Sequence, residues 1–332
     1  MEGKEKEKEK VFEEALKRLR KEYGSGVVMR LGDRKAVEKV DVIPTGSLTL
    51  DIATGIGGFP RGRIVEIYGA EMSGKTTLAL LAIAEAQRAG GKAVFIDAEH
   101  ALDPEYAAAL GVNVDELWVS QPDYGEQALS IMHEFVKSGA VDIIVLDSVA
   151  ALVPKAELKG EMEDVKVGDQ ARLMSKAMRM LAGAISKSNT LAIFINQVRM
   201  RIGDMYNPWT TAGGLALKFY SSLRIEVRRG SLLKDGDEPY GHALHFQVTK
   251  NKLAPPFRKG KVDLLYGKGI DKLGEIVDLA LKYGVLTRAG SWISYGDKTL
   301  AQGRERVIAL LKEKPELAEE LRKKVLEKAG LV

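Results

Sequence analysis

A glycine-containing turn at residues 69–76, with the sequence GAEMSGKT, constrains the fold more than any other stretch of the chain. An apolar run at 64–68 precedes it and another at 78–83 follows it, which predicts a strand, a tight turn and a helix. In such a turn, glycines let backbone N–H groups point at phosphate oxygens, and the helix N-terminus adds partial positive charge. Lys75 would reach the β- and γ-phosphates, and the Thr76 hydroxyl would bind Mg²⁺. The stretch therefore predicts a nucleotide-phosphate site, with a plain glycine turn as the alternative.

Composition narrows the class of protein. The chain has 332 residues, of which 45% are hydrophobic and 29% charged, enough for one large domain and one or two small ones. It contains no apolar run of membrane-spanning length and no secretory h-region at its start, so we expect no membrane partner and a cytoplasmic location. Cysteine is absent, which excludes disulfides and thiolate metal sites. A net charge of +4 is only mildly basic, so any nucleic-acid affinity must come from local patches.

Two short apolar runs that are typical of buried parallel strands end in acidic residues. Residues 92–97 lead into the sequence DAEH, and residues 141–147 end at Asp147. In doubly wound sheets the active groups gather at the carboxyl ends of the strands. We therefore expect a carboxylate at the first end to reach the γ-phosphate, and Asp147 to join Thr76 in the Mg²⁺ shell as a Walker B acid.

A third apolar run, residues 191–195, ends in two amides, Asn196 and Gln197. An amide at the carboxyl end of a strand beside a phosphate site can sense whether the γ-phosphate is present. The alternative is a cap on the turn that ends the strand.

The N-terminal region predicts a docking helix. Residues 1–10 alternate Lys and Glu, which favours a solvated, frayed start. Beyond them Phe12, Leu16 and further apolar residues recur at helical spacing as far as Gly24. A single short helix cannot build its own core, so this stripe must pack on the main domain or on another subunit.

Helices and strands alternate after the turn, as in a doubly wound sheet. Two later strand-like runs, joined by a Gly- and Asp-containing segment, predict an antiparallel hairpin that extends this sheet. From residue 271 short helices and glycine turns indicate a small C-terminal domain. The expected helices are 104–110, 125–138, 168–186, 274–283, 303–312 and 316–328, and the expected strands are 117–120, 222–228, 242–250 and 262–266.

Two long polar segments, residues 155–167 and 199–214, interrupt the alternation. Loops of this length inside a compact domain are usually functional or disordered. The second holds cations, aromatic rings and paired glycines, a mixture that suits single-stranded nucleic acid because cations follow phosphates and rings stack on bases. A surface loop or a lid is the alternative.

A series of motifs occurs in one order along the chain. They are IPTGS (43–47), GAEMSGKT (69–76), IDAEHALDP (96–104), DSVAALVPKAE (147–157), QARLMS (170–175), NQVRM (196–200), ALKFY (216–220) and KNK (250–252). Together they resemble the bacterial RecA recombinase family, from about residue 11 to residue 330. The resemblance implies an α/β P-loop NTPase of RecA type, with a mostly parallel sheet, helices on both faces and an antiparallel extension. It implies an N-terminal helix and linker for subunit docking (1–35), an ATPase core with two DNA-binding loops (36–270) and a small α+β C-terminal domain (271–332).

The resemblance also implies an activity, that of a DNA-dependent ATPase. Such a protein polymerises with ATP on single-stranded DNA, pairs it with a homologous duplex and exchanges strands in recombinational repair. The implied cofactors are ATP and Mg²⁺. The implied partners are single- and double-stranded DNA, further copies of the chain in a helical filament and, in the SOS response to DNA damage, a LexA-type repressor towards which the protein acts as a co-protease.

Individual residues receive roles by the same resemblance. Glu99 would activate the attacking water, Gln197 would report the γ-phosphate to the second loop, and Lys250 and Lys252 would reach the ATP of a neighbouring subunit. The implied catalytic residues are Glu99, Lys75, Gln197, Lys250 and Lys252. The implied nucleotide-binding residues are Gly69, Glu71, Ser73, Gly74, Lys75, Thr76, Thr77, Asp103, Tyr106 and Asp147, of which Thr76 and Asp147 would hold the metal. The implied DNA-binding residues are Glu161, Met162, Gly168, Arg172, Ser175, Arg179, Val198, Arg199, Met200, Arg201, Met205, Tyr206, Trp209, Thr211, Gly213 and Gly214, and the implied subunit-interface residues are Phe12, Leu16, Lys218 and Phe219.

The chain departs from the family pattern at several positions. Ala70 and Met72 replace the usual P-loop residues, and Tyr124 stands where Thr is usual. The second loop is one glycine shorter than usual, with Trp209 in place of an acidic residue. These changes leave open a RecA-fold ATP-binding scaffold whose DNA coupling is weakened or lost. A small-molecule kinase has no support, because the sequence offers no acceptor-binding domain or lid.

Overall fold

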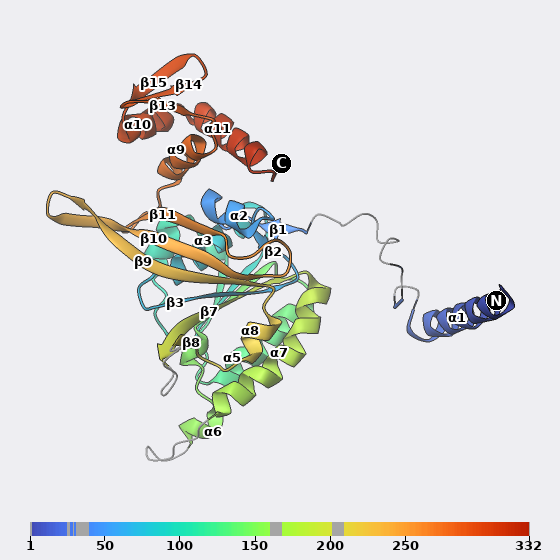
Figure 1. Cartoon of the computed structure of the whole chain (residues 1–332). Helices are drawn as coiled ribbons and strands as arrows, with labels where there is room; N and C mark the ends of the chain where they lie inside the picture. Colours follow the sequence, from blue (N-terminus) through green and yellow to red (C-terminus); the bar gives the residue numbers. More distant parts are fainter. Residues whose placement is uncertain are drawn as a thin grey trace. The chain divides into compact units, whose positions relative to one another are not determined.

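The computed structural model describes residues 2–24, 27–28, 30, 40–159, 168–200 and 209–331 (Figure 1). The chain forms two compact units, Met1–Asp41 and Val42–Val332. The first unit contains helix α1 (Glu2–Tyr23). The expectation of a frayed start over residues 1–10 is wrong, because α1 already begins at Glu2. Lys and Glu are both strong helix formers, and their alternation places opposite charges three residues apart on the helix surface.

The second unit is built on a sheet of ten strands within the described residues. Its order is β12-β11-β10-β9-β3-β7-β6-β4-β5, with β8 paired to β7 off this path. The strands from β9 to β5 run parallel, while β9 to β12 pair antiparallel, which confirms the predicted parallel sheet with an antiparallel extension. The strands are β3 (Ile64–Gly69), β4 (Ala93–Asp97), β5 (Leu117–Ser120), β6 (Ile143–Asp147), β7 (Leu191–Met200), β8 (Trp209–Thr211), β9 (Leu223–Asp235), β10 (Glu238–Asn251), β11 (Lys259–Leu265) and β12 (Gly269–Ile270).

Helices cover both faces of this sheet (Figure 1). On one face α3 (Lys75–Arg88) and α4 (Pro104–Ala109) bury their apolar side chains against one hydrophobic cluster. On the other face α5 (Gly125–Ser138) and α7 (Asp169–Ser188) pack against a second cluster. Further short elements of this unit are β1 (Val42–Ile43), α2 (Leu48–Thr54), β2 (Phe59–Pro60), α6 (Lys155–Leu158), α8 (Ala216–Tyr220) and two 3-10 turns at Val114–Glu116 and Val149–Ala151.

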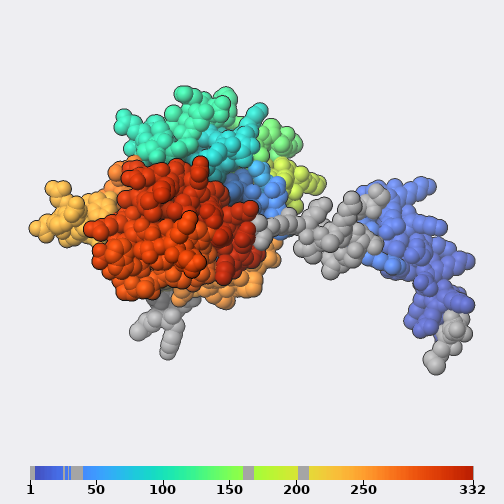
Figure 2. All heavy atoms as spheres, turned by 90° about the horizontal axis from the view of Figure 1, so that it is seen from above, coloured from blue at the N-terminus to red at the C-terminus, as the bar shows by residue number. Residues whose placement is uncertain are grey.

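The β9–β10 hairpin is longer than the sequence analysis predicted. Residues 230–235, expected as part of the connection, continue β9, and the turn is confined to Gly236 (φ 59°) and its neighbour. The two turn residues are Gly236 and Asp237, and glycine at the first central position favours a tight two-residue hairpin turn, so the pairing continues up to it. The hairpin extends beyond the rest of the sheet, as Figures 1 and 2 show.

The C-terminal elements enclose a separate hydrophobic cluster, to which α2 also contributes Leu48 and Ile52. The three expected helices are present, and a three-stranded sheet lies between them. The local sequence pattern indicated only glycine turns there, whereas the α+β class that the resemblance implied is confirmed. Gly290 and Gly296, both at positive φ, form the turns of that sheet. The elements are α9 (Lys272–Lys282), β13 (Thr287–Ala289), β14 (Trp292–Tyr295), β15 (Lys298–Gln302), α10 (Arg304–Glu313) and α11 (Pro315–Lys328).

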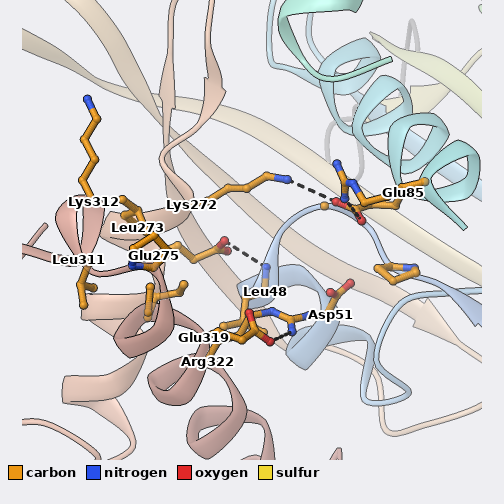
Figure 3. A pocket seen from close by; sticks show the side chains of 16 residues that line it. Leu48, Asp51, Glu85, Lys272, Leu273, Glu275, Leu311, Lys312, Glu319 and Arg322 are labelled. Carbon is orange, nitrogen blue, oxygen red and sulfur yellow. Dashed lines mark hydrogen bonds and ion pairs between the residues drawn. The ribbon is translucent and has the colours of Figure 1, made fainter. Parts of the chain in front are cut away.

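A buried carboxylate, Glu275 of α9, joins the C-terminal elements to the core (Figure 3). It accepts hydrogen bonds from the Ser47 hydroxyl at 2.6 Å and from the backbone N–H groups of Leu48 (3.0 Å) and Thr49 (2.7 Å). These donors lie at the N-terminus of α2, which a carboxylate stabilises. A cavity of about 560 Å³ adjoins this contact and is also lined by Asp51. In the part of the chain that the structure describes, no helix is long and apolar enough to cross a membrane.

Candidate functional site

The loop between β3 and α3 is shaped by two glycines. Gly74 has φ 93°, and a Cβ there would lie 2.6 Å from Leu244 Cδ1. A Cβ on Gly69 would lie 2.1 Å from the carbonyl oxygen of Val227 on β9. Both positions therefore require glycine. The Ser73 hydroxyl is buried and lacks a hydrogen-bond partner among the described residues, which leaves it available to a phosphate oxygen.

Lys75 supplies the positive charge of this loop. Its Nζ donates a hydrogen bond to the carbonyl oxygen of Ala70 at 2.6 Å, and the residue is buried. Burial lowers the pKa of Lys75, while the negative charges of Asp147, Glu99 and the exposed Glu71 oppose that shift. A triphosphate held by the backbone N–H groups at the start of α3 would meet this ammonium group.

Thr76, the next residue of α3, contacts the end of β6. Its hydroxyl donates to Asp147 Oδ2 at 2.6 Å. Burial, with a smaller contribution from the nearby charges of Glu99 and Asp97, raises the pKa of Asp147 to about 6 against the opposing effects of the Thr76 hydrogen bond and the Lys75 charge. A hydroxyl and a carboxylate oxygen side by side are the donors that Mg²⁺ uses in P-loop sites. No group of three His, Asp or Glu side chains suited to a metal occurs in the described ranges, and a P-loop metal does not need one, because phosphates and waters complete its shell.

Glu99 and Ser148 follow the ends of β4 and β6, and Gln197 lies on β7 where its parallel pairing with β3 ends. The strand does not end at the two amides as expected, because it continues to Met200 in pairing with β8. Gln197 Nε2 donates to Glu99 Oε1 at 2.9 Å, and the Ser148 hydroxyl donates to the same oxygen. The carboxylate is thereby oriented beside the Thr76–Asp147 pair, since β4 and β6 are neighbours in register. Ser148 was not among the predicted site residues. Its signal in the sequence is a hydroxyl directly after the strand-end acid.

The acid at the end of β4, Asp97, has a different task. Its buried carboxylate accepts hydrogen bonds from the backbone N–H groups of Ala101 (3.1 Å) and Leu102 (3.2 Å) and from Gln121 Nε2 (3.1 Å). Asp97 therefore holds the loop that follows β4. Of the DAEH sequence, Glu99 is the carboxylate that reaches Gln197 and Ser148.

The predicted adenine contacts lie at the start of α4. Tyr106 shares a hydrogen bond of 2.9 Å between its hydroxyl and that of Thr77 on α3, which fixes the ring beside the P-loop helix. Asp103 Oδ1 accepts from the backbone N–H groups of Glu105 (2.9 Å) and Tyr106 (3.2 Å) and thus caps α4. Of the two residues, Tyr106 contacts the helix that follows the phosphate loop. The contact of both residues with adenine stays a prediction.

Lys250 and Lys252 do not join the P-loop cluster of their own chain. Lys250 Nζ donates to the carbonyl oxygens of Lys218 (2.5 Å) and Phe219 (3.0 Å), and Lys252 Nζ donates to that of Phe219 at 3.2 Å. These carbonyls belong to α8, whose Phe219 ring is 68% exposed. Two lysines and an exposed ring therefore form one surface cluster, and Lys218 Nζ links α8 to the Thr210 hydroxyl at 2.8 Å.

The stem of the second predicted DNA loop is an antiparallel pair. Val198 lies opposite Thr211, Arg199 opposite Thr210, and Met200 opposite Trp209. Arg199, Met200 and Trp209 are exposed on this stem. Of the predicted DNA-binding residues, Glu161, Met162, Arg201, Met205 and Tyr206 lie outside the described residues.

The structure brings the exits of the two loops together. Gly213 and Gly214, which end the second loop, have φ 79° and 76°. A Cβ on Gly214 would lie 2.8 Å from Ala171 Cβ, in the first turn of α7 that ends the first loop. The predicted residues of that helix, Gly168, Arg172, Ser175 and Arg179, begin at the N-cap, and Arg172 and Arg179 are exposed. Arg172, the residue after Ala171, is thus placed next to the glycine-rich end of the second loop.

Comparisons with known proteins identify the family of the chain. A family model described as the RecA N-terminal domain matches residues 10–271, and one described as the RecA C-terminal domain matches residues 274–330. The crystal structure of the RadB recombinase is similar in fold, with a TM-score of 0.53 and 21% identity over 69% of this chain and 98% of that one.

Relatives with high identity cover nearly the whole chain. Protein RecA of Aquifex aeolicus is 60% identical over 328 residues, which are 98% of this chain and 94% of that protein. Protein RecA of Thermus thermophilus is 59% identical over 327 residues (98% and 96%), and that of Staphylococcus aureus is 57% identical over 326 residues (98% and 94%). With both domains matched in order and identity of this level along its length, the chain belongs to the RecA family.

Proposed function

We propose that this RecA recombinase hydrolyses ATP at the cluster formed by Lys75, Thr76, Asp147 and Glu99, and that the bound triphosphate controls its grip on DNA. DNA-dependent ATPase activity, DNA binding and filament formation follow from membership of the family. The observation that carries the residue assignments is the orientation of Glu99. Its carboxylate is held by Gln197 and Ser148 at the edge of the sheet where Thr76 meets Asp147.

The chemistry divides among these side chains. Lys75 neutralises phosphate charge that builds up in the transition state, and Glu99 orients and activates the attacking water as a general base. The Gln197 side-chain amide donates its N–H to Glu99 Oε1 at 2.9 Å. A γ-phosphate that accepts this N–H would draw Gln197 away from Glu99. The movement of Gln197 would shift β7, the strand that begins the second DNA loop.

Thr76 and Asp147 are the residues that would hold Mg²⁺. The ion would neutralise phosphate charge and orient the β- and γ-phosphates. Asp147 is suited to this task because burial and two neighbouring carboxylates raise its pKa, so that a cation rather than bulk water stabilises its ionised form.

We propose that the filament is assembled through α1 and α8. One face of α1 exposes Phe12 (61%) and carries the half-buried Leu16. An apolar groove of about 650 Å³ lies along the sheet-edge strand β5 and α5, lined by Trp118, Ile131 and Phe135 among others. The α1 stripe of one copy would pack in the groove of the next, while Lys250 and Lys252 would reach the neighbour's ATP. A contact between two different surfaces builds an open helix when the rotation from one copy to the next does not close a ring.

DNA is proposed to bind at the two neighbouring loop exits, with Arg172, Arg179 and Arg199 following phosphates and Trp209 stacking on a base. Pairing with a homologous duplex and stimulated cleavage of a LexA-type repressor belong to the same proposal. The domain limits of 1–35, 36–270 and 271–332 are also part of this proposal.

Steady-state hydrolysis of ATP, measured with and without single-stranded DNA, tests the proposal. We expect turnover to rise when DNA is added. Turnover that DNA leaves unchanged would favour the second candidate, an ATP-binding scaffold, which the shortened second loop and Trp209 support. Titration with an oligonucleotide at several salt concentrations separates the two further, because phosphate neutralisation gives affinity a steep dependence on salt.

A further inference from the structure

A buried amide, Asn196, lies between the two ends of the second loop. Its side chain is fully buried, and all of its strong hydrogen-bonding groups are used. Nδ2 donates to Glu66 Oε1 at 3.0 Å and to the carbonyl oxygen of Ala212 at 3.0 Å, while Oδ1 accepts from the backbone N–H of Gln197 at 2.9 Å. One side chain thus bonds to the residue where the loop begins and to the residue where it returns.

A chain of polar groups anchors this amide in the sheet. Glu66 of β3 is fully buried and forms an ion pair with Arg224 of β9. The Arg224 guanidinium lies 4.5 Å above the centre of the Tyr68 ring. The Tyr68 hydroxyl donates to the Thr249 hydroxyl of β10 at 3.0 Å. Buried groups of this kind hold their geometry firmly, because breaking one contact leaves a charge or a donor without a partner.

Each anchored residue is the neighbour of a residue assigned above to nucleotide, DNA or subunit contacts. Tyr68 precedes the P-loop glycine Gly69, and it lies opposite Asn196 in the β3–β7 register. Ala212 precedes the glycine pair that ends the second loop, and Thr249 precedes Lys250. The polar chain therefore connects the start of the phosphate loop, the γ-phosphate sensor, the loop exit and the strand that carries the lysines.

We propose that Asn196 is a positioning residue that makes Gln197 and the return strand of the second loop move as one unit. A displacement of the Gln197 backbone has to carry Asn196 Oδ1 with it, and the same amide pulls on Ala212 through Nδ2. The inference rests on the proposed function in one respect, the role of Gln197 as sensor. The inference adds the Asn196 side chain as the group that transmits the movement of Gln197 to the DNA contacts at the other end of the second loop.

The variant Asn196→Ala tests this role, because it removes all three hydrogen bonds and leaves Gln197 and Glu99 intact. We expect the affinity for an ATP analogue to stay within about three-fold of wild type, since no P-loop group is touched. The ratio of DNA-stimulated to basal turnover should fall about ten-fold or more, within the usual range of coupling between two sites.

Thr190→Val is the matched control. Thr190 lies just before the opposite end of β7, is fully buried, and donates from its hydroxyl to the Val141 carbonyl oxygen at 2.8 Å. Loss of this hydrogen bond in Thr190→Val should lower the melting temperature without changing the ratio of DNA-stimulated to basal turnover. If Asn196→Ala, assayed at a temperature where it is folded, keeps the same ratio as Thr190→Val, the role of Asn196 is only structural and the inference is overturned.

Exchanging the donor and the acceptor of the Asn196–Glu66 hydrogen bond should restore part of the coupling. Asn196→Asp puts a carboxylate against Glu66 and should lose coupling more severely than Asn196→Ala. Adding Glu66→Gln restores a donor for the new carboxylate and should recover part of the turnover ratio. A double variant no better than Asn196→Asp alone contradicts the proposed contact.

Hydrogen exchange without DNA decides the inference independently of the recombinase activity. In Asn196→Ala the backbone amides of residues 197–200 and 209–212 should exchange faster together, whereas in Thr190→Val they should match wild type. Faster exchange at one end only, or at neither, overturns the inference. If wild-type turnover itself ignores DNA, the proposed function fails, and the exchange result still stands or falls on its own.

Discussion

Replacing Asp51 by Asn should make the stability of the protein less dependent on pH. Asp51 lies on α2 beside the junction with the C-terminal elements, is 6% exposed, and accepts a hydrogen bond from the backbone N–H of Thr45 at 2.8 Å (Figure 3). Burial raises the pKa of this carboxyl to about 7; the hydrogen bonds from Thr45 and the charge of Arg322 oppose the rise, and the charge of Glu275 adds to it. Compared with the ordinary aspartate pKa of 3.8, this rise corresponds to about 4 kcal/mol.

The direction of the pH dependence follows from which state of the protein holds the proton on Asp51. Between about pH 4 and pH 7 the folded protein keeps a proton on Asp51 that the unfolded chain releases. The contribution of Asp51 to the free energy of unfolding is therefore fully present below pH 3.8 and is lost as the pH rises through about 7. The variant side chain of Asp51→Asn does not titrate and keeps an acceptor oxygen for the Thr45 N–H.

Urea unfolding of wild type and Asp51→Asn at several pH values between about 4.5 and 8.5 measures this difference. As the pH rises, the free energy of unfolding of the variant should increase relative to that of wild type. The change in this difference should approach about 4 kcal/mol across the full pH range. Thr190→Val, which changes no titratable group, should differ from wild type by the same amount at every pH. A difference between Asp51→Asn and wild type that stays constant over this range would refute the reasoning.

Four further substitutions probe the proposed site. Lys75→Ala should abolish ATP binding, measured with a fluorescent analogue, and retained binding would remove Lys75 from the site. Glu99→Gln should bind the same analogue but hydrolyse ATP at least about 100-fold more slowly, because the general base is lost; a normal rate would assign the base elsewhere. Trp209→Ala should weaken binding of a labelled oligonucleotide by about 10-fold through loss of stacking, while Trp209→Phe keeps most of it, and equal affinities would exclude stacking. Trp118→Glu should raise the protein concentration needed for filaments by about 10-fold in light scattering, with ATP binding unchanged, and normal assembly would exclude the groove as the α1 acceptor.

The phosphate site could be predicted because its parts follow from local chemistry and one rule of topology. The P-loop is contiguous in the sequence, and the carboxyl ends of parallel strands meet at one edge of the sheet. That rule was enough to bring a carboxylate of the DAEH sequence, Asp147 and Gln197 together from separate strands, and the family resemblance singled out Glu99. It did not distinguish Asp97 from Glu99, because which of two nearby acids holds a loop and which faces the phosphate depends on the turn after β4.

Contacts between distant side chains could not be predicted in the same way. Glu66 and Asn196 are 130 residues apart, and Glu275 is 228 residues from the Ser47 that it contacts. No sequence motif marks either pair. The residues around an acid in an apolar strand or on an amphipathic helix do not indicate which distant side chain it contacts in the folded protein. The early start of α1 was missed for the opposite reason. Its Lys and Glu residues were judged by their solvation, although their helix propensity decides the local structure.

The central claim is that ATP held at a subunit boundary assembles the chain on single-stranded DNA. Electron microscopy of the full chain with single-stranded DNA and a non-hydrolysable ATP analogue tests it most directly. We predict helical filaments in the presence of both ligands, and their loss in Lys75→Ala. Particles that remain monomeric with both ligands saturating would contradict the claim.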